Sequence, residues 1–220
     1  MKPGSTPRTT LKRISHKASH SEQDLYSILD SNLVAHVGII FDNSPLVIPM
    51  AYGRFGNLLY LHGSSGSRLM RALSSNPEVC VSITELNGLK VARSTFNSGM
   101  QYRAAVIFGR AELVPDQHKA AALDAISDAM LPGRVAEVRP SSKKELAATL
   151  IISLPLNEAS VKISTNPVED EPEDLGQGTW AGILPIITSV AQPIPADAEA
   201  ESLALPDSVQ RFVRDYPNNR

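Results

Sequence analysis

The sequence contains a single cysteine, Cys80, and no long apolar run. One cysteine cannot build an intrachain disulfide framework, so the chain fits a reducing compartment. No stretch approaches the ~18 consecutive apolar residues of a membrane-spanning helix. The N-terminal residues "MKPGSTPRTTLKR" also lack the apolar segment of a signal peptide. We therefore expect a cytoplasmic protein that does not enter a membrane.

Neither sign of charge predominates, since 21 Lys and Arg face 23 Asp and Glu and the formal net charge is -2. This balance provides no general attraction to nucleic acid or to anionic lipid, and we expect neither as a partner. Any anion site must therefore be local. The histidines and Cys80 show no spacing typical of zinc ligands, so no metal site is predicted.

Short apolar segments separated by turn residues make up the middle of the chain. The predicted strands are 33–41, 46–53, 58–63, 77–86, 89–95, 101–114 and 158–165, followed by the apolar run 179–190. Asn87-Gly88 is a strong hairpin signal between the fourth and fifth of these strands. Helical spacing appears at 22–31, after Ser67, at 116–131 and at 143–150. So few interposed helices favour an antiparallel barrel or sandwich over a parallel sheet.

The ends of the chain differ from this middle part. Residues 1–21 are polar and basic, and we expect an arm that either stays mobile or becomes ordered on contact with something else. Residues 22–195 have the length of one main domain. Residues 196–220 are predicted to form a tail on the surface.

The segment "HGSSGSR" (62–68) joins a predicted strand to a predicted helix. Backbone N–H groups at a helix start, serine hydroxyls and the Arg68 guanidinium could together bind a phosphate. Gly63 and Gly66 would allow a close approach of the backbone. The alternative is an ordinary turn with a serine cap. The segment is neither a Walker A loop nor the Gly-x-Ser-x-Gly elbow of a hydrolase.

Two arginines share a strand face with apolar residues, namely Arg93 with Val91 and Arg103 with Ala105. A charge in such a position is costly unless it is paired. Each arginine therefore needs either a carboxylate partner, such as Glu85 or Glu112, or a bound anion.

Three further residues have both a structural and a functional interpretation. Pro49 interrupts an apolar strand, which should be an edge, bulged, or open where a planar ligand packs on Ile48 and Met50. His62 either contacts a ligand or is held by a backbone carbonyl. Trp180 either packs against the protein or covers a ligand ring.

Taken in order, the segments "LVAHVGII", "PLVIPMAYGR", "NLLYLHGSSGSRLMRAL", "PEVCVSIT" and "GLKVARSTFNSGMQYRAAVIFGRAELV" resemble flavin-nucleotide-binding proteins related to pyridoxamine 5'-phosphate oxidase. The similarity extends from about Arg8 to Pro195, and the branch that includes nitroimidazole reductases is the most similar. This resemblance implies a mainly β fold with peripheral helices, a split antiparallel β-barrel of the FMN-binding type formed by residues 22–195. It also implies a homodimer that binds FMN, or FAD in some members, in a cleft between subunits.

The resemblance also assigns roles to residues. By this similarity Ser64, Ser67 and Arg68 would contact the phosphate, and Pro49 and Met50 would line the isoalloxazine. Arg93, Ser94, Tyr102 and Arg103 would complete the cleft, and His62 would be the catalytic group beside the flavin. Trp180 is added to the cofactor residues on its aromatic character alone. In two places the sequence departs from its relatives. Arg68 stands where many have lysine, which keeps the cation, and "TFNSGMQ" replaces a histidine-containing segment, which removes an acid/base group.

The resulting hypothesis is an FMN-dependent oxidoreductase that passes two electrons to a small-molecule acceptor, with NAD(P)H as a candidate donor. No pyridoxamine phosphate recognition tail is found, so oxidation of that vitamer is not expected. The first alternative is a non-catalytic protein that stores or senses flavin or haem, although no histidine is clearly placed as an axial ligand. The second is a barrel without a working site that acts through its dimer surface.

Overall fold

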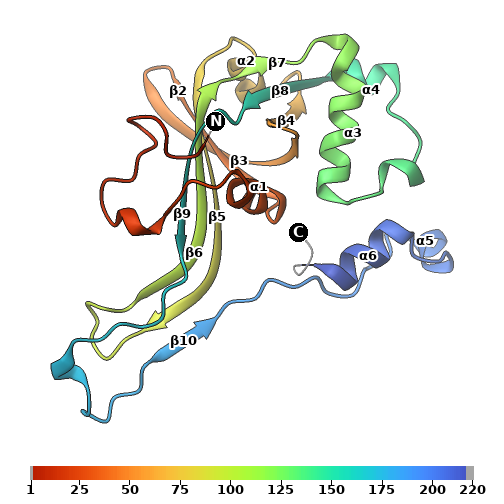
Figure 1. Cartoon of the computed structure of the whole chain (residues 1–220). Helices are drawn as coiled ribbons and strands as arrows, with labels where there is room; N and C mark the ends of the chain where they lie inside the picture. The colour runs from red at the N-terminus through yellow and green to blue at the C-terminus, as the bar shows by residue number, and fades with distance from the viewer. Residues whose placement is uncertain (1, 217–220) are drawn as a thin grey trace.

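The computed structural model of the protein describes residues 2–216 and is built around one sheet of ten antiparallel strands (Figure 1). The strands are β1 (Ala18–Ser19), β2 (Val34–Phe41), β3 (Ser44–Phe55), β4 (Leu58–Ser64), β5 (Glu78–Val91), β6 (Gly99–Arg110), β7 (Glu112–Leu113), β8 (Thr149–Pro155), β9 (Glu158–Ser164) and β10 (Gly182–Pro185). The helices are α1 (Glu22–Asp30), α2 (Arg68–Leu73), α3 (Lys119–Met130), α4 (Lys143–Ala148), α5 (Ala198–Ser202) and α6 (Asp207–Asp215), with 3-10 helices η1 (Ser15–Lys17), η2 (Asp116–His118), η3 (Val135–Glu137) and η4 (Pro172–Asp174). None of the helices in residues 2–216 has the length and apolar character needed to cross a bilayer.

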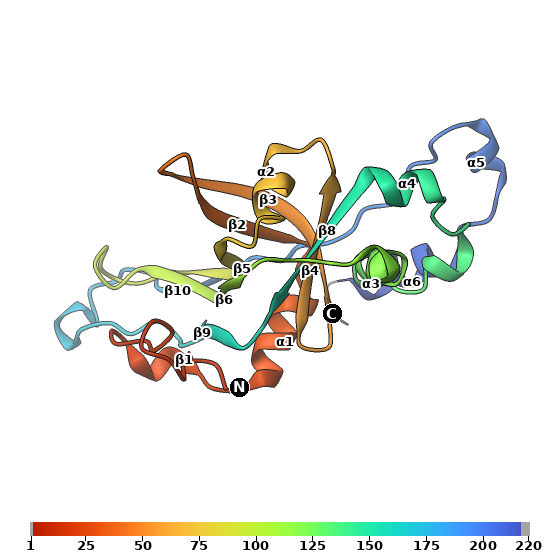
Figure 2. The same cartoon turned by 90° about the horizontal axis from the view of Figure 1, so that it is seen from above.

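The barrel closes because one continuous stretch of chain, β6 followed by β7, pairs at both of its ends. β6 pairs with β5 and β9, whereas β7 pairs with β8. The path from β5 through β2, β3, β4 and β8 therefore returns to the stretch from which it began. β9 follows β8 but leaves the ring to pair with β6, which splits the barrel (Figure 2). The split antiparallel barrel predicted from the sequence is confirmed.

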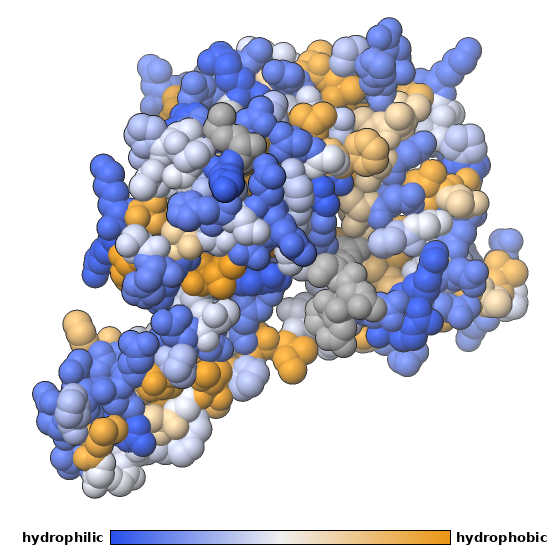
Figure 3. All heavy atoms as spheres, viewed as in Figure 1, coloured by the Kyte–Doolittle hydropathy of each residue, from blue (hydrophilic) through white to orange (hydrophobic). Residues whose placement is uncertain are grey.

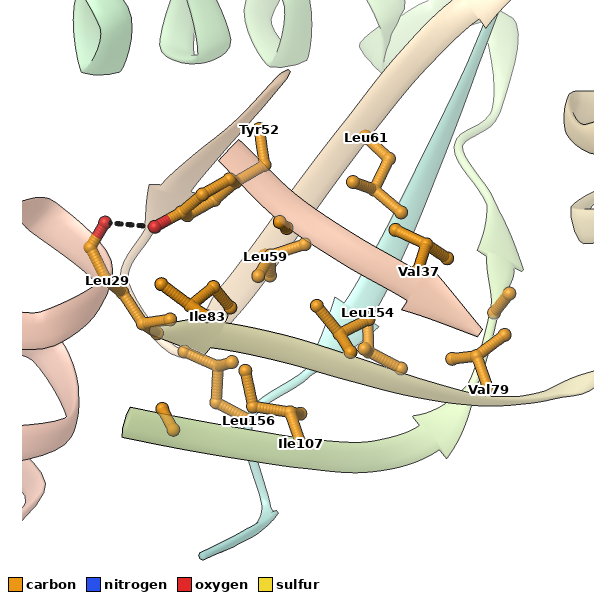
Figure 4. Close-up of a cluster of buried hydrophobic side chains, with 14 of the residues drawn as sticks. Leu29, Val37, Tyr52, Leu59, Leu61, Val79, Ile83, Ile107, Leu154 and Leu156 are labelled. Carbon is orange, nitrogen blue, oxygen red and sulfur yellow. Dashed lines mark hydrogen bonds between the residues drawn. The ribbon is translucent and has the colours of Figure 1, made fainter. Parts of the chain in front are cut away.

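Alternate side chains of these strands fill the barrel, as a strand period of two requires. The most deeply buried positions include Val37, Leu59, Leu61, Ile83, Ile107 and Leu154 (Figure 4). Helix α1 covers one end of the barrel with Leu25, Ile28 and Leu29. The Tyr52 hydroxyl donates a hydrogen bond of 2.6 Å to the Leu29 carbonyl, which satisfies a buried polar group at this junction.

Helix α3 packs on the outside of the barrel against β3, where Gly53 carries no side chain. A Cβ atom at Gly53 would lie 2.7 Å from the Cα of Ile126 and 3.1 Å from the Cβ of Ala129. Ile126 and Ala122 form a second apolar cluster with Val114. Gly53 is therefore the residue that allows this helix to approach the sheet.

The predicted hairpin at Asn87-Gly88 is wrong. β5 runs without interruption from Glu78 to Val91, and the predicted strands 77–86 and 89–95 belong to it. Its pairing with β6 changes register between Leu86 and Gly88, so Asn87 is the extra residue of a β-bulge. Beyond the bulge, β5 pairs with β6 on one side and with β10 on the other. These two ladders hold the chain in strand conformation, so it does not turn back at Asn87.

β8 was not predicted as a strand, because the helix at 143–150 was expected to lead directly to strand 158–165. Helix α4 ends at Ala148, and Thr149 already belongs to β8. Both faces of this strand are buried, with Ile152 in the barrel and Ile151 under α3. A continuous apolar run has no period that distinguishes a buried strand from a helix.

The N-terminal segment predicted as an arm makes its contacts with the edge of the chain's own sheet. The N–H of Gly4 donates to the Ala159 carbonyl at 2.7 Å, and β1 pairs with β9. Arg8 forms an ion pair of 2.6 Å with Glu158. The predicted tail contains α5 and α6. Residue 1 of the arm and residues 217–220 of the tail lie outside the described residues.

Candidate functional site

The serine loop (residues 64–68) leaves β4 and enters α2 at an exposed corner of the barrel. Ser67 is the N-cap of α2, and its hydroxyl accepts from the N–H of Met70 at 3.4 Å. The Ser64 hydroxyl accepts from the N–H of Gly66 at 3.1 Å. Gly63 brings α2 close to β4, because a Cβ there would lie 2.8 Å from the Cγ of Met70. The loop is thus both a helix cap and a surface with free hydroxyl donors.

Several donors of the serine loop are already used within the protein. The N–H groups of Ser65 and Ser67 donate to the carbonyls of Ala148 and Ser64, respectively. Within residues 2–216, no acceptor is found for the N–H groups of Arg68 and Leu69. The donors that remain for an anion are therefore these two N–H groups and the serine hydroxyls. They are fewer than the sequence pattern suggests, but enough to hold phosphate oxygens.

The guanidinium of Arg68 stands 5.1 Å from the centre of the Phe41 ring. No carboxylate of the described residues lies within ion-pair distance of it, so its charge is not neutralised inside the chain. Phe41, at the end of β2, was not predicted to take part in the site. Only the fold places this ring beside the loop.

His62 lies on β4, two residues before the loop, and is half-buried. Its Nδ1 atom is buried and has no hydrogen-bond partner in residues 2–216. Burial lowers the pKa of His62 below its ordinary value, so the imidazole is neutral near pH 7. Of the two interpretations given by the sequence, a histidine held by a backbone carbonyl through Nδ1 does not fit this structure.

Pro49 marks the place where β3 changes partners. β3 pairs with β2 from Ser44 to Ala51 and with β4 only from Tyr52 onward. At Pro49 the other side of the strand is therefore unpaired, as a residue without an N–H requires. Pro49 points outward and is exposed, whereas Met50 packs against the barrel core. The two residues face opposite sides of the strand, and Pro49 faces the surface.

Arg93 and Arg103 both find carboxylate partners inside the chain. Arg93 forms an ion pair of 2.6 Å with Asp170, which also accepts from the backbone N–H of Arg93 at 2.7 Å. Arg103 pairs with Glu85 at 2.6 Å and donates to the hydroxyls of Ser27 and Ser31. Asp170 was not predicted as a partner. The charge argument for an anion at these arginines is thereby removed, and their role in a cofactor cleft rests on the family resemblance.

The Arg103–Glu85 pair should make stability depend on pH. Burial alone would raise the pKa of Glu85, but hydrogen bonds from Arg103, Asn87 and Ser31 outweigh it and the pKa is lowered. The stabilisation is complete above the pKa of the unfolded carboxyl, near 4.5, and is lost as the pH falls through the lower folded value. Glu85→Gln should lower the free energy of unfolding at pH 7 by about 1–3 kcal/mol. Its deficit relative to wild type should shrink at acid pH.

The control for this experiment is Arg139→Gln, which breaks an exposed ion pair with Glu145. Exposed pairs contribute little, so this variant should unfold like wild type in urea at either pH. An equal loss of unfolding free energy in both variants would mean that the Arg103–Glu85 pair stabilises the protein no more than an exposed ion pair does.

The predicted cofactor residues fall into separate places along the sheet. β2 runs antiparallel to β5, with His36 opposite Ser82, so Phe41 at the end of β2 lies beyond Glu78, the first residue of β5. Arg68 contacts the ring of this Phe41. Arg93 and Ser94 follow the opposite end of this 14-residue strand, which is about 45 Å long at ~3.3 Å per residue. Within one chain, the serine loop and Arg93 therefore cannot contact the same small molecule.

The far ends of β5 and β6, together with β10 and residues 166–181, form a distal arm that projects from the barrel (Figure 1). Trp180 lies on this arm and folds back on Gly182, where a Cβ would meet its ring at 2.8 Å. Tyr102 lies between the two regions, opposite Leu86. Ser64, Ser67 and Arg68 thus lie in one loop that begins two residues after His62, whereas Arg93, Ser94 and Trp180 lie on the distal arm.

The outer face of the sheet between these two regions is unusually apolar. Its outward side chains Val34, Ile40, Val47, Leu86, Leu89, Met100 and Leu184 are between 40% and 69% exposed, and we call them the outer-face patch. Hydrophobic residues are visible on the projecting arm in Figure 3. Apolar surface of this extent usually marks a contact with another molecule.

A cavity of about 820 Å³ lies elsewhere, between α1, α3 and the β3–β4 hairpin. Tyr52, Phe55 and Tyr60 line it together with the alanine face of α3. None of the predicted cofactor residues borders it. The described residues also contain no group of three His, Cys, Asp or Glu side chains arranged to hold a metal ion.

Comparisons with known proteins place these features in a family. A family model described as pyridoxamine 5'-phosphate oxidase matches residues 21–163. The FAD and haem binding protein from Mycobacterium smegmatis is 40% identical with a TM-score of 0.87, over 90% of this chain and 97% of its own. The flavocytochrome Anf3 from Azotobacter vinelandii is 35% identical with a TM-score of 0.88, over 94% and 97% of the two chains. A search of curated proteins found no match.

Proposed function

Because the chain belongs to the pyridoxamine 5'-phosphate oxidase family, we propose that it binds a flavin nucleotide and works as an oxidoreductase on a small acceptor. The observation that carries the proposal is the serine loop with its last residue, Arg68, whose charge has no carboxylate partner within residues 2–216. A phosphate would supply that partner. The neighbouring His62 offers an unpartnered ring nitrogen next to the same loop.

In this proposal the chain's residues bind and orient the cofactor, and the flavin, when bound, supplies two-electron redox chemistry. Arg68 and the hydroxyls of Ser64 and Ser67 would hold the phosphate. His62, neutral at pH 7, would donate or accept one hydrogen bond beside the reacting groups. NADH or NADPH is the proposed electron donor, and a nitroaromatic or a quinone is the class of acceptor to be tested.

The proposed site is completed by a second copy of the chain. Arg93, Ser94 and Trp180 lie on the distal arm, out of reach of the serine loop of the same molecule. A symmetric pair that buries the outer-face patch could place the distal arm of one copy near the loop of the other. This arrangement would reconcile the residues assigned by resemblance with their separation in one chain.

Haem is a second candidate ligand, alone or beside the flavin. It is favoured by the names of the two relatives, an FAD and haem binding protein and a flavocytochrome, which match almost the full length of this chain. A neutral imidazole is the form of histidine that ligates iron, and burial keeps His62 in that form. His62 is therefore the residue proposed to hold a haem iron.

The visible absorption spectrum of the purified protein tests these proposals. An oxidised flavin would give its characteristic yellow absorption bands, and a haem would show an intense Soret band. Chromatography of the released cofactor would separate FMN, predicted from the sequence, from FAD, favoured by the first relative. A protein that stays colourless after incubation with FMN, FAD and haemin would refute both.

His62→Ala should affect the two candidates differently. If His62 holds a haem iron, the variant should lose the Soret band while the flavin bands remain. If it serves only the redox reaction, both cofactors should stay bound and turnover with NADPH and a nitroaromatic acceptor should fall about 10²-fold, typical of a lost acid–base group. His16→Ala, on the exposed 3-10 helix η1 of the N-terminal segment, is the matched control and should change neither property.

A further inference from the structure

The C-terminal strap (residues 186–206) connects β10 to α6 and is almost entirely exposed. Figure 1 shows it as the blue segment that runs from β10 to α5 and α6. Ile187 is 77% exposed, Ile194 is 92% exposed and Leu203 is 64% exposed. Large aliphatic side chains are rarely left in water in such a row, and a covering surface is the usual explanation.

The strap is anchored at its two ends but not between them. At its start the N–H of Ile186 donates to the Asn87 carbonyl at 2.9 Å. Just past its end Ser208, buried at the start of α6, donates twice to the Glu137 carboxylate, through its N–H at 2.8 Å and its hydroxyl at 2.5 Å. Within the described part of the chain, no hydrogen bond or ion pair joins residues 187–206 to residues 2–185.

This arrangement does not fit a disordered linker. A flexible linker is rich in polar residues and glycine, whereas the strap contains Ile186, Ile187, Ile194, Leu203 and Leu205 and no glycine. Its prolines at 193, 195 and 206 restrict the backbone beside them and reduce the entropy lost on docking. The segment before α5 (Ala198–Ser202) is therefore preorganised and apolar, and is suited to lie across another surface.

The position of the strap indicates which surface it covers. It starts two residues after Leu184, a member of the outer-face patch, and continues the exposed apolar surface of the sheet. A stable dimer interface needs roughly 800 Å² from each partner. In a twofold pair each copy would contribute both its patch and its strap, so two patches and two straps would be buried in the interface.

We infer that the C-terminal strap lies across a second copy of this chain and clamps the dimer. The inference rests on the dimer proposed above and deepens it, since it names the segment that crosses between copies. The two anchors keep the ends of the strap on its own molecule, and the apolar side chains between them face the partner.

The test uses a photo-cross-linking amino acid in place of Ile194 in the full-length chain. Two differently tagged copies are coexpressed and irradiated. We expect a product of two chain masses that carries both tags. The control position is Phe55, which is 67% exposed on the turn between β3 and β4 and should give no such product.

Cross-links confined to a single chain, or no cross-link at all, would show that the strap covers its own molecule or nothing, and would overturn the inference. As a second measurement, Ile187→Asp with Ile194→Asp should raise the dimer dissociation constant at least 10-fold in analytical ultracentrifugation. Phe55→Asp should not. An unchanged dissociation constant in a folded double variant would count against the clamp.

The absorption spectrum of the same samples keeps this inference separate from the proposed function. A coloured dimer without cross-links between chains would refute the strap alone. A colourless dimer with such cross-links would refute the cofactor proposal and leave the strap in place. A monomer at micromolar concentration would refute the proposed dimer and the clamp together, while its colour would still decide the cofactor.

Discussion

Arg68→Ala should weaken flavin binding about 10- to 100-fold, because a charge-assisted hydrogen bond to a phosphate contributes ~1.5–3 kcal/mol. The loss is attributed to the phosphate because the Arg68 guanidinium has no carboxylate partner in residues 2–216, so removing it breaks no ion pair there. The measurement is a titration of the apoprotein with FMN and with FAD, followed by the quenching of flavin fluorescence.

Arg71→Ala is the matched control, since Arg71 is exposed on the same helix, one turn further along. It should bind flavin like wild type. Arg68→Lys should recover part of the affinity, because a lysine keeps the charge but not the two-pronged geometry of the guanidinium. Equal affinity of wild type and Arg68→Ala would mean that the phosphate does not lie at the serine loop.

Gly53→Val should produce the largest loss of stability, about 3 kcal/mol or more, by separating α3 from the barrel. The first added carbon would lie 2.7 Å from the Cα of Ile126 and 3.3 Å from the carbonyl oxygen of Ala125. Both contacts are with helix backbone, which cannot turn aside as a flexible side chain could. Urea unfolding followed by circular dichroism gives the change in free energy.

Gly99→Val is the control for the glycine substitution itself. Gly99 lies at the start of β6, and a Cβ there would meet only the Cε of Lys90, at 3.9 Å. This variant should be as stable as wild type, because valine suits a strand. If both variants unfolded at the same urea concentration, α3 would not be packed on β3 as described.

The sequence alone was sufficient for the fold class and the family. Short apolar segments separated by turn residues predicted the strands that became β2, β3 and β4, because turn chemistry is set by the residues of the turn itself. The residues of the serine loop also predicted the start of α2 and allowed a serine cap, which Ser67 provides. Strand segments, turns and helix caps depend mainly on residues that are close in the sequence, so patterns in the sequence can predict them.

Local patterns failed where pairing with distant residues decides the structure. Asn87-Gly88 has the chemistry of a tight turn, yet it forms a bulge, because β6 and β10 pair on both sides of the strand beyond it. β8 carries no alternation, because the barrel buries one of its faces and α3 the other. In both places the contact that decides the structure comes from a segment far away in the sequence.

The same division holds for the candidate site. The sequence by itself determined that Arg93 and Arg103 must each be neutralised, because a charge among apolar neighbours is costly wherever it lies. Only the tertiary structure decided that Asp170 and Glu85 neutralise them, and that of the three arginines predicted for the site Arg68 is the one without a carboxylate partner in residues 2–216. The physical reason is that the need for a counter-charge belongs to a residue and its strand, whereas the choice of partner depends on which distant side chains the closed barrel brings within a few ångströms.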